Sequence, residues 1–284
     1  MTISEQVEQR VYDRLEAYDG VELNENTPIS GSIASVLSSN EVLADNGEQY
    51  SSIQSAVNNS ENWVFAGPGT YYENVTIDKD DFTLQGAGYD TLIDGGSAGY
   101  GVEIKSDDSV LANISVKTTG GAGTNYHAIN ITSSGSKLES VVVRDSDNRG
   151  IVCDNGSDTI IHNCIVESSD VHAIQTGLRT IVTDCLMKPN VTKDGVNISG
   201  DDCIVANCVI DTVGVDGGDG IAIFANDNIV IGNRIINVQG ERGIDVNDNN
   251  NIIANNRVSD SPVSDINNGG TGTVTDGNLT GSAN

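Results

Sequence analysis

The sequence is poor in basic residues, aromatic residues and proline, and it has no long apolar run. Lys and Arg together number 14 against 41 Asp and Glu, which gives a net charge of −27 at pH 7. A surface with that charge repels phosphate, so we expect neither nucleic acid nor an anionic membrane as a partner. No stretch approaches the roughly 18 consecutive apolar residues of a membrane-spanning helix, so insertion into a membrane is not expected.

The excess of acidic residues also bears on the salt concentration in which the protein works. In molar salt the Debye length falls to about 3 Å, and repulsion among surface carboxylates nearly disappears. Scarce Lys and abundant Asp resemble the composition of proteins from haloarchaea and their viruses. The alternative interpretation is that the charge serves solubility alone.

Cysteines are few, and their number is odd. None of the five stands in a zinc-binding spacing, and we predict no disulfide framework. Cys164, Cys185 and Cys208 each follow an equivalent bend residue, so we expect them to stack as small buried apolar side chains. The Asp and Asn runs match no calcium-binding pattern, so neither a metal site nor a cofactor is predicted.

The sequence does contain an internal repeat, and a period of twenty-odd residues indicates stacked structural repeats. Each copy in residues 100–258 holds two short runs with alternating apolar positions, separated by Gly, Asn, Asp and Ser. That alternation predicts strands. In the first run the expected inward pairs are Val102/Ile104, Ile129/Ile131, Ile151/Cys153, Ile174/Thr176, Val196/Ile198, Ile221/Ile223 and Ile244/Val246.

The second run carries a polar bend residue in every copy, with an aliphatic residue two positions before it. The expected bends are Asn113, Ser140, Asn163, Asp184, Asn207, Asn233 and Asn255, and the aliphatic residues are Leu111, Leu138, Ile161, Val182, Val205, Ile231 and Ile253. Such columns form when each copy stacks on the last, with parallel strands about 4.8 Å apart. Asn at a bend tolerates left-handed backbone and can bond its amide to the next coil. We therefore predict an all-β chain, a single-stranded right-handed parallel β-helix of about nine coils.

The segment before the coils carries a resemblance to a known family. Ile53-Gln54 with Ala56, then Pro68-Gly69, Tyr71, Glu73, Val75 and Ile77, and then Leu84, Gly86 and Gly88 are similar to the opening of the pectin-lyase-like superfamily of right-handed β-helices. The resemblance covers roughly residues 49–275. It implies a short helix near residues 50–59 that caps the first coil, since an uncapped solenoid exposes strand edges.

Three segments follow from these patterns. Residues 1–48 are expected to form a docking arm, with an amphipathic helix over residues 3–18 whose apolar stripe is Ile3, Val7, Val11, Leu15 and Tyr18. Residues 49–275 form the β-helix with its cap. Residues 276–284 are a polar tail.

The family's catalytic motifs are incomplete in this chain. Pectate lyases use acids that bind calcium and an arginine base on one sheet, but the matching outward column here has acids only at Glu103 and Asp245 and no arginine. Gly200-Asp201-Asp202-Cys203 resembles the quartet of polygalacturonases, whose other motifs are absent. In this chain the quartet falls in a turn, where Gly and Asp are ordinary.

A polar row precedes the first strand of each copy and is the candidate site. Its members, each followed by Gly or Ala, are Tyr100, His127, Arg149, His172, Asp194, Asp219 and Arg242. We expect His127, Arg149, His172 and Arg242 to bind a ligand or partner. Asp194 and Asp219 would lie about 5 Å apart, a separation that suits a retaining glycosidase. The alternative is a solvated ridge of turn residues.

These features lead to the hypothesis of a non-enzymatic structural or glycan-binding component of a halophilic archaeal virus particle, such as a tail spike, fibre or capsid projection. Residues 1–20 lack a signal core, which favours assembly in the host cytoplasm and location in the virion. The arm would contact other virion proteins, and an apolar row (Val142, Ile165, Leu186, Val209, Ile235) would support a homotrimer. Host glycan or glycoprotein is the expected receptor.

Two alternatives stay open. One is a polysaccharide-degrading glycosidase or lyase of the β-helix class, using Asp194 and Asp219. The other is a cellular surface module, extracellular or at the cell surface.

Overall fold

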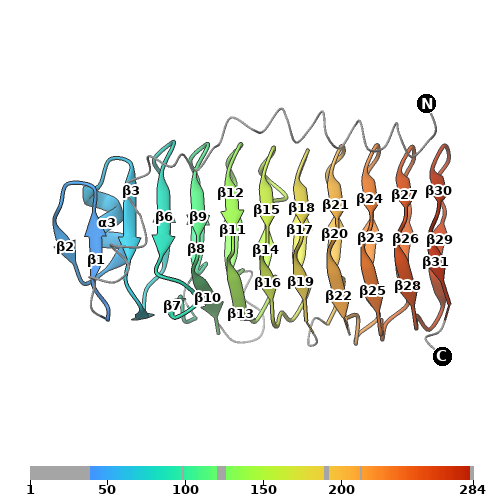
Figure 1. The fold of residues 1–284 in the computed structure, drawn as a ribbon, viewed down its shortest axis with the longest axis horizontal. Helices are drawn as coiled ribbons and strands as arrows, with labels where there is room; N and C mark the ends of the chain where they lie inside the picture. Colours follow the sequence, from blue (N-terminus) through green and yellow to red (C-terminus); the bar gives the residue numbers. More distant parts are fainter. Residues whose placement is uncertain (1–38, 98, 120–125, 189–191, 212, 282–284) are drawn as a thin grey trace. The chain divides into compact units, whose positions relative to one another are not determined.

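The computed structural model describes residues 39–281, apart from 98, 120–125, 189–191 and 212. These residues form a parallel β-helix of three sheets (Figure 1). The helix expected over residues 3–18 lies outside the described residues. No helix within the described part of the chain is long and apolar enough to cross a membrane.

Sheet A forms one side of the β-helix. Its twelve strands follow the order β2 (Gln49–Tyr50), β1 (Val42–Ala44), β3 (Trp63–Ala66), β6 (Thr83–Gly86), β9 (Val110–Ala112), β12 (Lys137–Glu139), β15 (Ile160–His162), β18 (Ile181–Thr183), β21 (Ile204–Ala206), β24 (Ile229–Ile231), β27 (Ile252–Ala254) and β30 (Val274–Asp276). All neighbours pair in parallel except β2, β1 and β3, which are antiparallel.

Sheets B and C form the other two sides. Sheet B comprises β4 (Gly69–Tyr71), β7 (Thr91–Asp94), β10 (Ser115–Thr118), β13 (Val142–Ser146), β16 (Ile165–Val166), β19 (Leu186–Met187), β22 (Val209–Asp211), β25 (Arg234–Ile236), β28 (Arg257–Ser259) and β31 (Leu279–Thr280). Sheet C comprises β5 (Val75–Ile77), β8 (Val102–Ile104), β11 (Ile129–Ile131), β14 (Ile151–Val152), β17 (Ile174–Thr176), β20 (Val196–Ile198), β23 (Ile221–Ile223), β26 (Arg242–Val246) and β29 (Ser264–Asn268). The predicted all-β solenoid of about nine coils is confirmed.

The register of sheet C is the predicted one. Ile129 pairs with Val102 and Ile151, and the column continues through Ile174, Val196, Ile221 and Ile244. These side chains are fully buried, and together with the inward residues of sheets A and B they form one aliphatic core. The alternating pattern fixes the register because a slip of one residue would turn every apolar side chain outward.

The bend between sheets A and B has a left-handed backbone in every copy, as expected. In one copy this bend lies one residue earlier than predicted from the sequence. Positive φ angles occur at Asn113, Ser140, Asn163, Asp184, Asn207, Gly232 and Asn255. Gly232, rather than Asn233, therefore makes the sixth bend, and Val230, rather than Ile231, is the buried partner of Val205. Glycine adopts this conformation at no steric cost, which leaves the following Asn free to turn inward.

The position after the bend carries a continuous interior column. Cys164, Cys185 and Cys208 occupy it as buried free thiols, so their predicted stacking is confirmed. The column then continues with Asn233, Asn256 and Asn278. The Cys208 N–H donates to the Asn233 side-chain oxygen at 2.9 Å, and the same bond repeats from Asn233 to Asn256 and from Asn256 to Asn278. The amide ladder thus lies one residue beyond the bend.

A short helix, α3 (Ile53–Asn59), covers the first coil, as the family resemblance implies. Ser52 caps its N-terminus, and the Glu73 carboxylate accepts the N–H groups of Ile53 and Gln54 at 2.8 and 3.0 Å. Lys79 Nζ donates to the carbonyls at the other end of the helix. The buried Ile53, Ala56 and Val57 then seal the apolar core.

Strands lie beyond both expected limits of the β-helix. β1 falls within the expected arm of residues 1–48, because Val42 and Ala44 bury their side chains against the cap. β31 falls within the expected tail of residues 276–284, where Leu279 pairs with Arg257.

The apolar row on sheet B is shorter than predicted. Ile165, Leu186 and Val209 occupy successive outward positions and are half-buried, whereas Val142 in the same column is buried. Ile235 instead points into the core, and Arg234 takes its place in the outward column. The pairing on both sides of Gly232 is regular, so the difference comes from the bend predicted at Asn233: counted from Gly232, Arg234 rather than Ile235 is equivalent to Val209.

Candidate functional site

The polar row lies along one edge of sheet C and is in register from coil to coil. The N–H of the small residue after each member bonds to the carbonyl of the next member: Gly150 to His172, Ala173 to Asp194, Gly195 to Asp219 and Gly220 to Arg242, at 2.9 to 3.1 Å. The three-residue insertion at 216–218 leaves this register intact. Because every member lies at the same point of its coil, the residues of the polar row stack in one continuous column.

Two carboxylates of this row are tied to the backbone of the following coil. Asp194 Oδ1 accepts the N–H of Asp219 at 2.9 Å, and Asp219 Oδ1 accepts the N–H of Arg242 at 2.8 Å. Both residues are buried. Asp194 and Asp219 are therefore neighbours, as predicted, and they help to hold the coils together.

His172 lies beside Asp194. Its Nδ1 is 3.1 Å from Asp194 Oδ2 and 3.3 Å from the Asp194 N–H. One ring nitrogen cannot donate to the carboxylate and accept from the N–H at once, so we assign the shorter contact, a donation from Nδ1. Asn197 Nδ2 donates to the same oxygen at 2.8 Å. Both oxygens of Asp194 are thereby engaged.

The environments of the two carboxylates push their pKa values apart. Burial by itself raises the pKa of Asp194, but the hydrogen bond and charge of His172, with the Asp219 N–H, outweigh it and lower the pKa. Burial raises the pKa of Asp219 to about 7, and the charges of Asp194 and Asp245 add to the effect. A pair separated in this way is the electrostatic pattern of a protonated general acid beside an ionised carboxylate.

Arg242 follows the two carboxylates in the row and forms ion pairs with two further acids. Its Nη1 lies 2.8 Å from Glu241 Oε2 and 3.4 Å from Asp245 Oδ2. Asp245 faces outward on β26 but is only 6% exposed, and it accepts the amides of Asn247 and Asn267 at 2.9 and 2.7 Å. The predicted binding residue Arg242 is thus engaged by acids of its own chain.

The other end of the row is aromatic and basic. The rings of Tyr100 and Tyr126 meet edge to face with centroids 5.5 Å apart, and Tyr100 lies 5.6 Å from the His127 ring. Burial, with the charge of Arg149, lowers the pKa of His127 to about 4. In this region three buried atoms lack a hydrogen-bond partner among the described residues: His127 Nδ1, Arg149 Nε and, outside the row on β17, Gln175 Oε1. Buried polar atoms without partners are costly, so this end of the row is suited to receive polar groups of a ligand.

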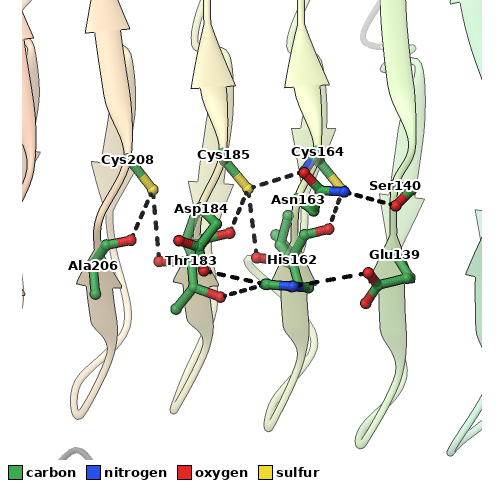
Figure 2. A network of polar contacts seen from close by, with 12 residues as sticks. Glu139, Ser140, His162, Asn163, Cys164, Thr183, Asp184, Cys185, Ala206 and Cys208 are labelled. Carbon is green, nitrogen blue, oxygen red and sulfur yellow. Dashed lines mark hydrogen bonds and ion pairs between the residues drawn. The ribbon is translucent and has the colours of Figure 1, made fainter. Parts of the chain in front are cut away.

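A second polar cluster lies where sheet A meets the bend and was not foreseen. Figure 2 shows His162 between Glu139 and Asp184 on neighbouring coils. Nε2 is 3.8 Å from Glu139 Oε1, and Nδ1 is 3.0 Å from Thr183 Oγ1 and 3.5 Å from Asp184 Oδ2. Glu139 faces Nε2 and Asp184 faces Nδ1 of the same ring, so the three side chains cannot all coordinate one metal ion. No group of His, Cys, Asp and Glu suited to a metal ion occurs in the part of the chain that the structure describes.

The quartet Gly200–Cys203 lies in the turn between β20 and β21. Asp202 has a left-handed φ of 62°, and the buried Cys203 thiol contacts the Gly177 carbonyl oxygen at 2.9 Å. Asp201 Oδ1 accepts the N–H of Asn226 in the next coil at 2.7 Å. Each of these three residues therefore has a structural part in the turn.

No protein-family model matches this chain, and no curated protein matches it in sequence. Its fold does match solved structures. An alginate lyase from Paenibacillus sp. str. FPU-7 is 15% identical with a TM-score of 0.65, covering 81% of this chain and 95% of that one. ORF18 of Geobacillus virus E2 is 14% identical with a TM-score of 0.61, covering 81% and 57%. The enzymatically active domain of bacteriophage CBA120 tailspike protein 2 is 14% identical with a TM-score of 0.58, covering 81% and 40%.

These likenesses show the fold. The chain has the right-handed β-helix architecture found in polysaccharide lyases and in phage tailspikes. It spans 57% and 40% of the lengths of the two viral proteins.

The raised pKa of Asp219 predicts a pH-dependent loss of stability. The usual value is 3.8, so between about pH 4 and 7 the folded protein keeps a proton that the unfolded chain has lost, and stability falls as pH rises through this window. Asp219→Asn keeps the oxygen that accepts the Arg242 N–H. We expect this variant to be more stable than the parent by about 4 kcal/mol at pH 8 and nearly equal to it at pH 4.

Urea unfolding at the two pH values, at constant salt, measures this difference. Asp216→Asn is the control, because Asp216 is an exposed turn acid. An equal effect of Asp219→Asn at both pH values would contradict the assignment.

Proposed function

We propose that this chain is a non-enzymatic, glycan-binding component of a virus particle of a halophilic archaeon, of the tailspike or surface-projection kind. The observation that carries the proposal is that buried polar atoms without partners occur on three successive coils, at His127, Arg149 and Gln175, with the exposed Tyr126 next to His127 in the chain. An aromatic side chain with unpaired donors and acceptors suits a sugar, which offers both C–H faces and hydroxyl groups. The net charge of −27 supports a saline environment.

The geometry of the carboxylates favours binding over cleavage. Hydrogen bonds that stabilise a carboxylate weaken it as a nucleophile, and Asp194 receives three: from the Asp219 N–H on Oδ1 and from Asn197 and His172 on Oδ2. Asp219 in turn holds the Arg242 N–H. Both acids are therefore used to join coils.

The proposal includes assembly. Ile165, Leu186 and Val209 offer a half-buried apolar row for side-by-side contact in a homotrimer. The helix expected over residues 3–18 would attach the chain to other virion proteins. Host surface glycan is the proposed receptor, and the location is the virion.

Binding to glycans purified from haloarchaeal cell surfaces, in molar KCl, tests the proposal. We expect binding without release of reducing ends. Arg149→Gln should weaken it about tenfold, since one charge-assisted hydrogen bond contributes about 1.5 kcal/mol. Arg257→Gln, an exposed cation on sheet B, is the matched control and should bind as the parent does. Equal affinity of the two variants would overturn the assignment of the site.

A second candidate function is glycoside hydrolysis. It is favoured by the pKa of about 7 at Asp219, which suits a general acid. Release of reducing ends in the same assay, abolished by Asp219→Asn, would establish hydrolysis and contradict the non-enzymatic proposal.

A further inference from the structure

The turns between sheet C and sheet A differ in length at one place. Nine positions separate Ile151 from Ile160, seven separate Ile174 from Ile181, and eight separate Val196 from Ile204. A long turn, a short turn and a turn of intermediate length therefore lie side by side. The short turn is recessed between its neighbours.

The recess is a hollow of about 460 Å³, here called the turn notch. Its walls include Asp154, Asn155 and Ser157 from the long turn, Leu178 from the short one, and Ser199 and Asp201 from the next coil. Leu178 is 38% exposed, so an apolar side chain is open to solvent inside a polar rim.

Two glycines let the coils approach closely at the turn notch: Gly200, which lines it, and Gly177, which precedes Leu178. A Cβ on Gly177 would lie 1.9 Å from the Cys153 carbonyl oxygen, and a Cβ on Gly200 would lie 2.3 Å from the Gly177 carbonyl oxygen. Only glycine fits at these positions, because the coils approach so closely. The hollow is therefore built into the packing of the coils.

Both rims carry a carboxylate. Asp154 accepts the amides of Asn155 at 2.9 Å and Gln175 at 3.4 Å, one on each oxygen. Asp201 Oδ1 accepts the Asn226 N–H and amide. A carboxylate has about four lone-pair sites, so acceptor capacity remains on both acids.

We propose that the turn notch binds a neutral hexose unit. The volume fits a small ligand, for which pockets start at about 300 Å³, and far exceeds the roughly 30 Å³ of a single water or ion. Carboxylates accept hydrogen bonds from vicinal hydroxyls, and Leu178 contacts a C–H face of the ring. The two acids repel a uronate, so the ligand is uncharged. The turn notch has its own lining residues and does not depend on the function proposed for the polar row, although the Gln175 amide that donates to Asp154 also carries one of the unpaired atoms assigned to that site.

The test is an NMR titration of the folded chain with methyl glucoside, methyl mannoside and methyl galactoside. We expect at least one to shift the amide signals of residues 178 and 199–201, while sodium glucuronate shifts none. Asp201→Asn retains the acceptor for the Asn226 N–H and should weaken binding about tenfold. Asn155→Tyr should abolish it by filling the hollow. Arg149→Gln should leave it unchanged, which separates this site from the polar row.

Three outcomes would overturn the proposal. One is the absence of any shift with all three hexosides. Another is a response to terbium ions alone, which would make the turn notch a cation site. The third is hexoside binding that Asp201→Asn and Asn155→Tyr leave intact while Arg149→Gln removes it.

Discussion

Replacing Asn256 with leucine is expected to lower the free energy of unfolding by about 3 kcal/mol. The Asn256 oxygen accepts both the N–H and the amide of Asn233, at 2.9 and 3.0 Å, and its nitrogen donates to the Val230 carbonyl and to Asn278, at 2.9 and 3.0 Å. Leucine has a similar volume but offers no polar atom. The variant therefore leaves the buried Asn233 N–H and the Val230 carbonyl without this partner, and each such group costs about 1–3 kcal/mol.

Equilibrium urea unfolding in molar salt measures the loss. Cys208→Ala is the matched control, because it alters the same interior column but removes only a thiol. We expect it to cost about 1 kcal/mol. A loss for Asn256→Leu no greater than that of the control would show that the amide ladder contributes little.

Gly177→Ala is expected to destabilise the fold by about 3 kcal/mol. The added methyl would meet the Cys153 oxygen at 1.9 Å and the Gly156 oxygen at 2.4 Å, both in the backbone of the preceding coil. A backbone in the middle of a stacked solenoid cannot move away without disturbing its own hydrogen bonds. Gly99→Ala is the control, since its nearest atom is the Asn74 side-chain nitrogen at 3.2 Å.

Thermal unfolding followed by circular dichroism compares the two glycine variants. The control should stay within about 0.5 kcal/mol of the parent. If Gly177→Ala unfolds at the parent's temperature, the coils are less closely packed at the turn notch than the structure indicates.

The fold could be predicted from the sequence because sheet C repeats without interruption. Pairs such as Ile129/Ile131 and Val196/Ile198 bury both members, and their spacing alone sets the register. The one misaligned copy shows the limit of this reasoning. Asn233 looks like the other bend residues, but Gly232 adopts the left-handed angle more readily, and Asn233 becomes an interior hydrogen-bonding group.

The sequence predicted which residues stack in the polar row, but it did not predict the contacts that their side chains make. The stacking of His172, Asp194 and Asp219 follows from the repeat. Their hydrogen bonds to the backbone of the next coil depend on side-chain rotamers, which the amino-acid sequence does not specify. The turn notch was missed for another reason: it arises from a difference in length between neighbouring turns, and no single residue marks it.

The interior column beside the bend changes its chemistry along the molecule, from Ile114 and Val141 through three thiols to Asn233 and Asn256. Contacts between hydrocarbon groups weaken on cooling, because their driving force near room temperature is entropic. Amide hydrogen bonds are enthalpic and loosen on heating instead. Cooling and warming therefore weaken opposite ends of this column.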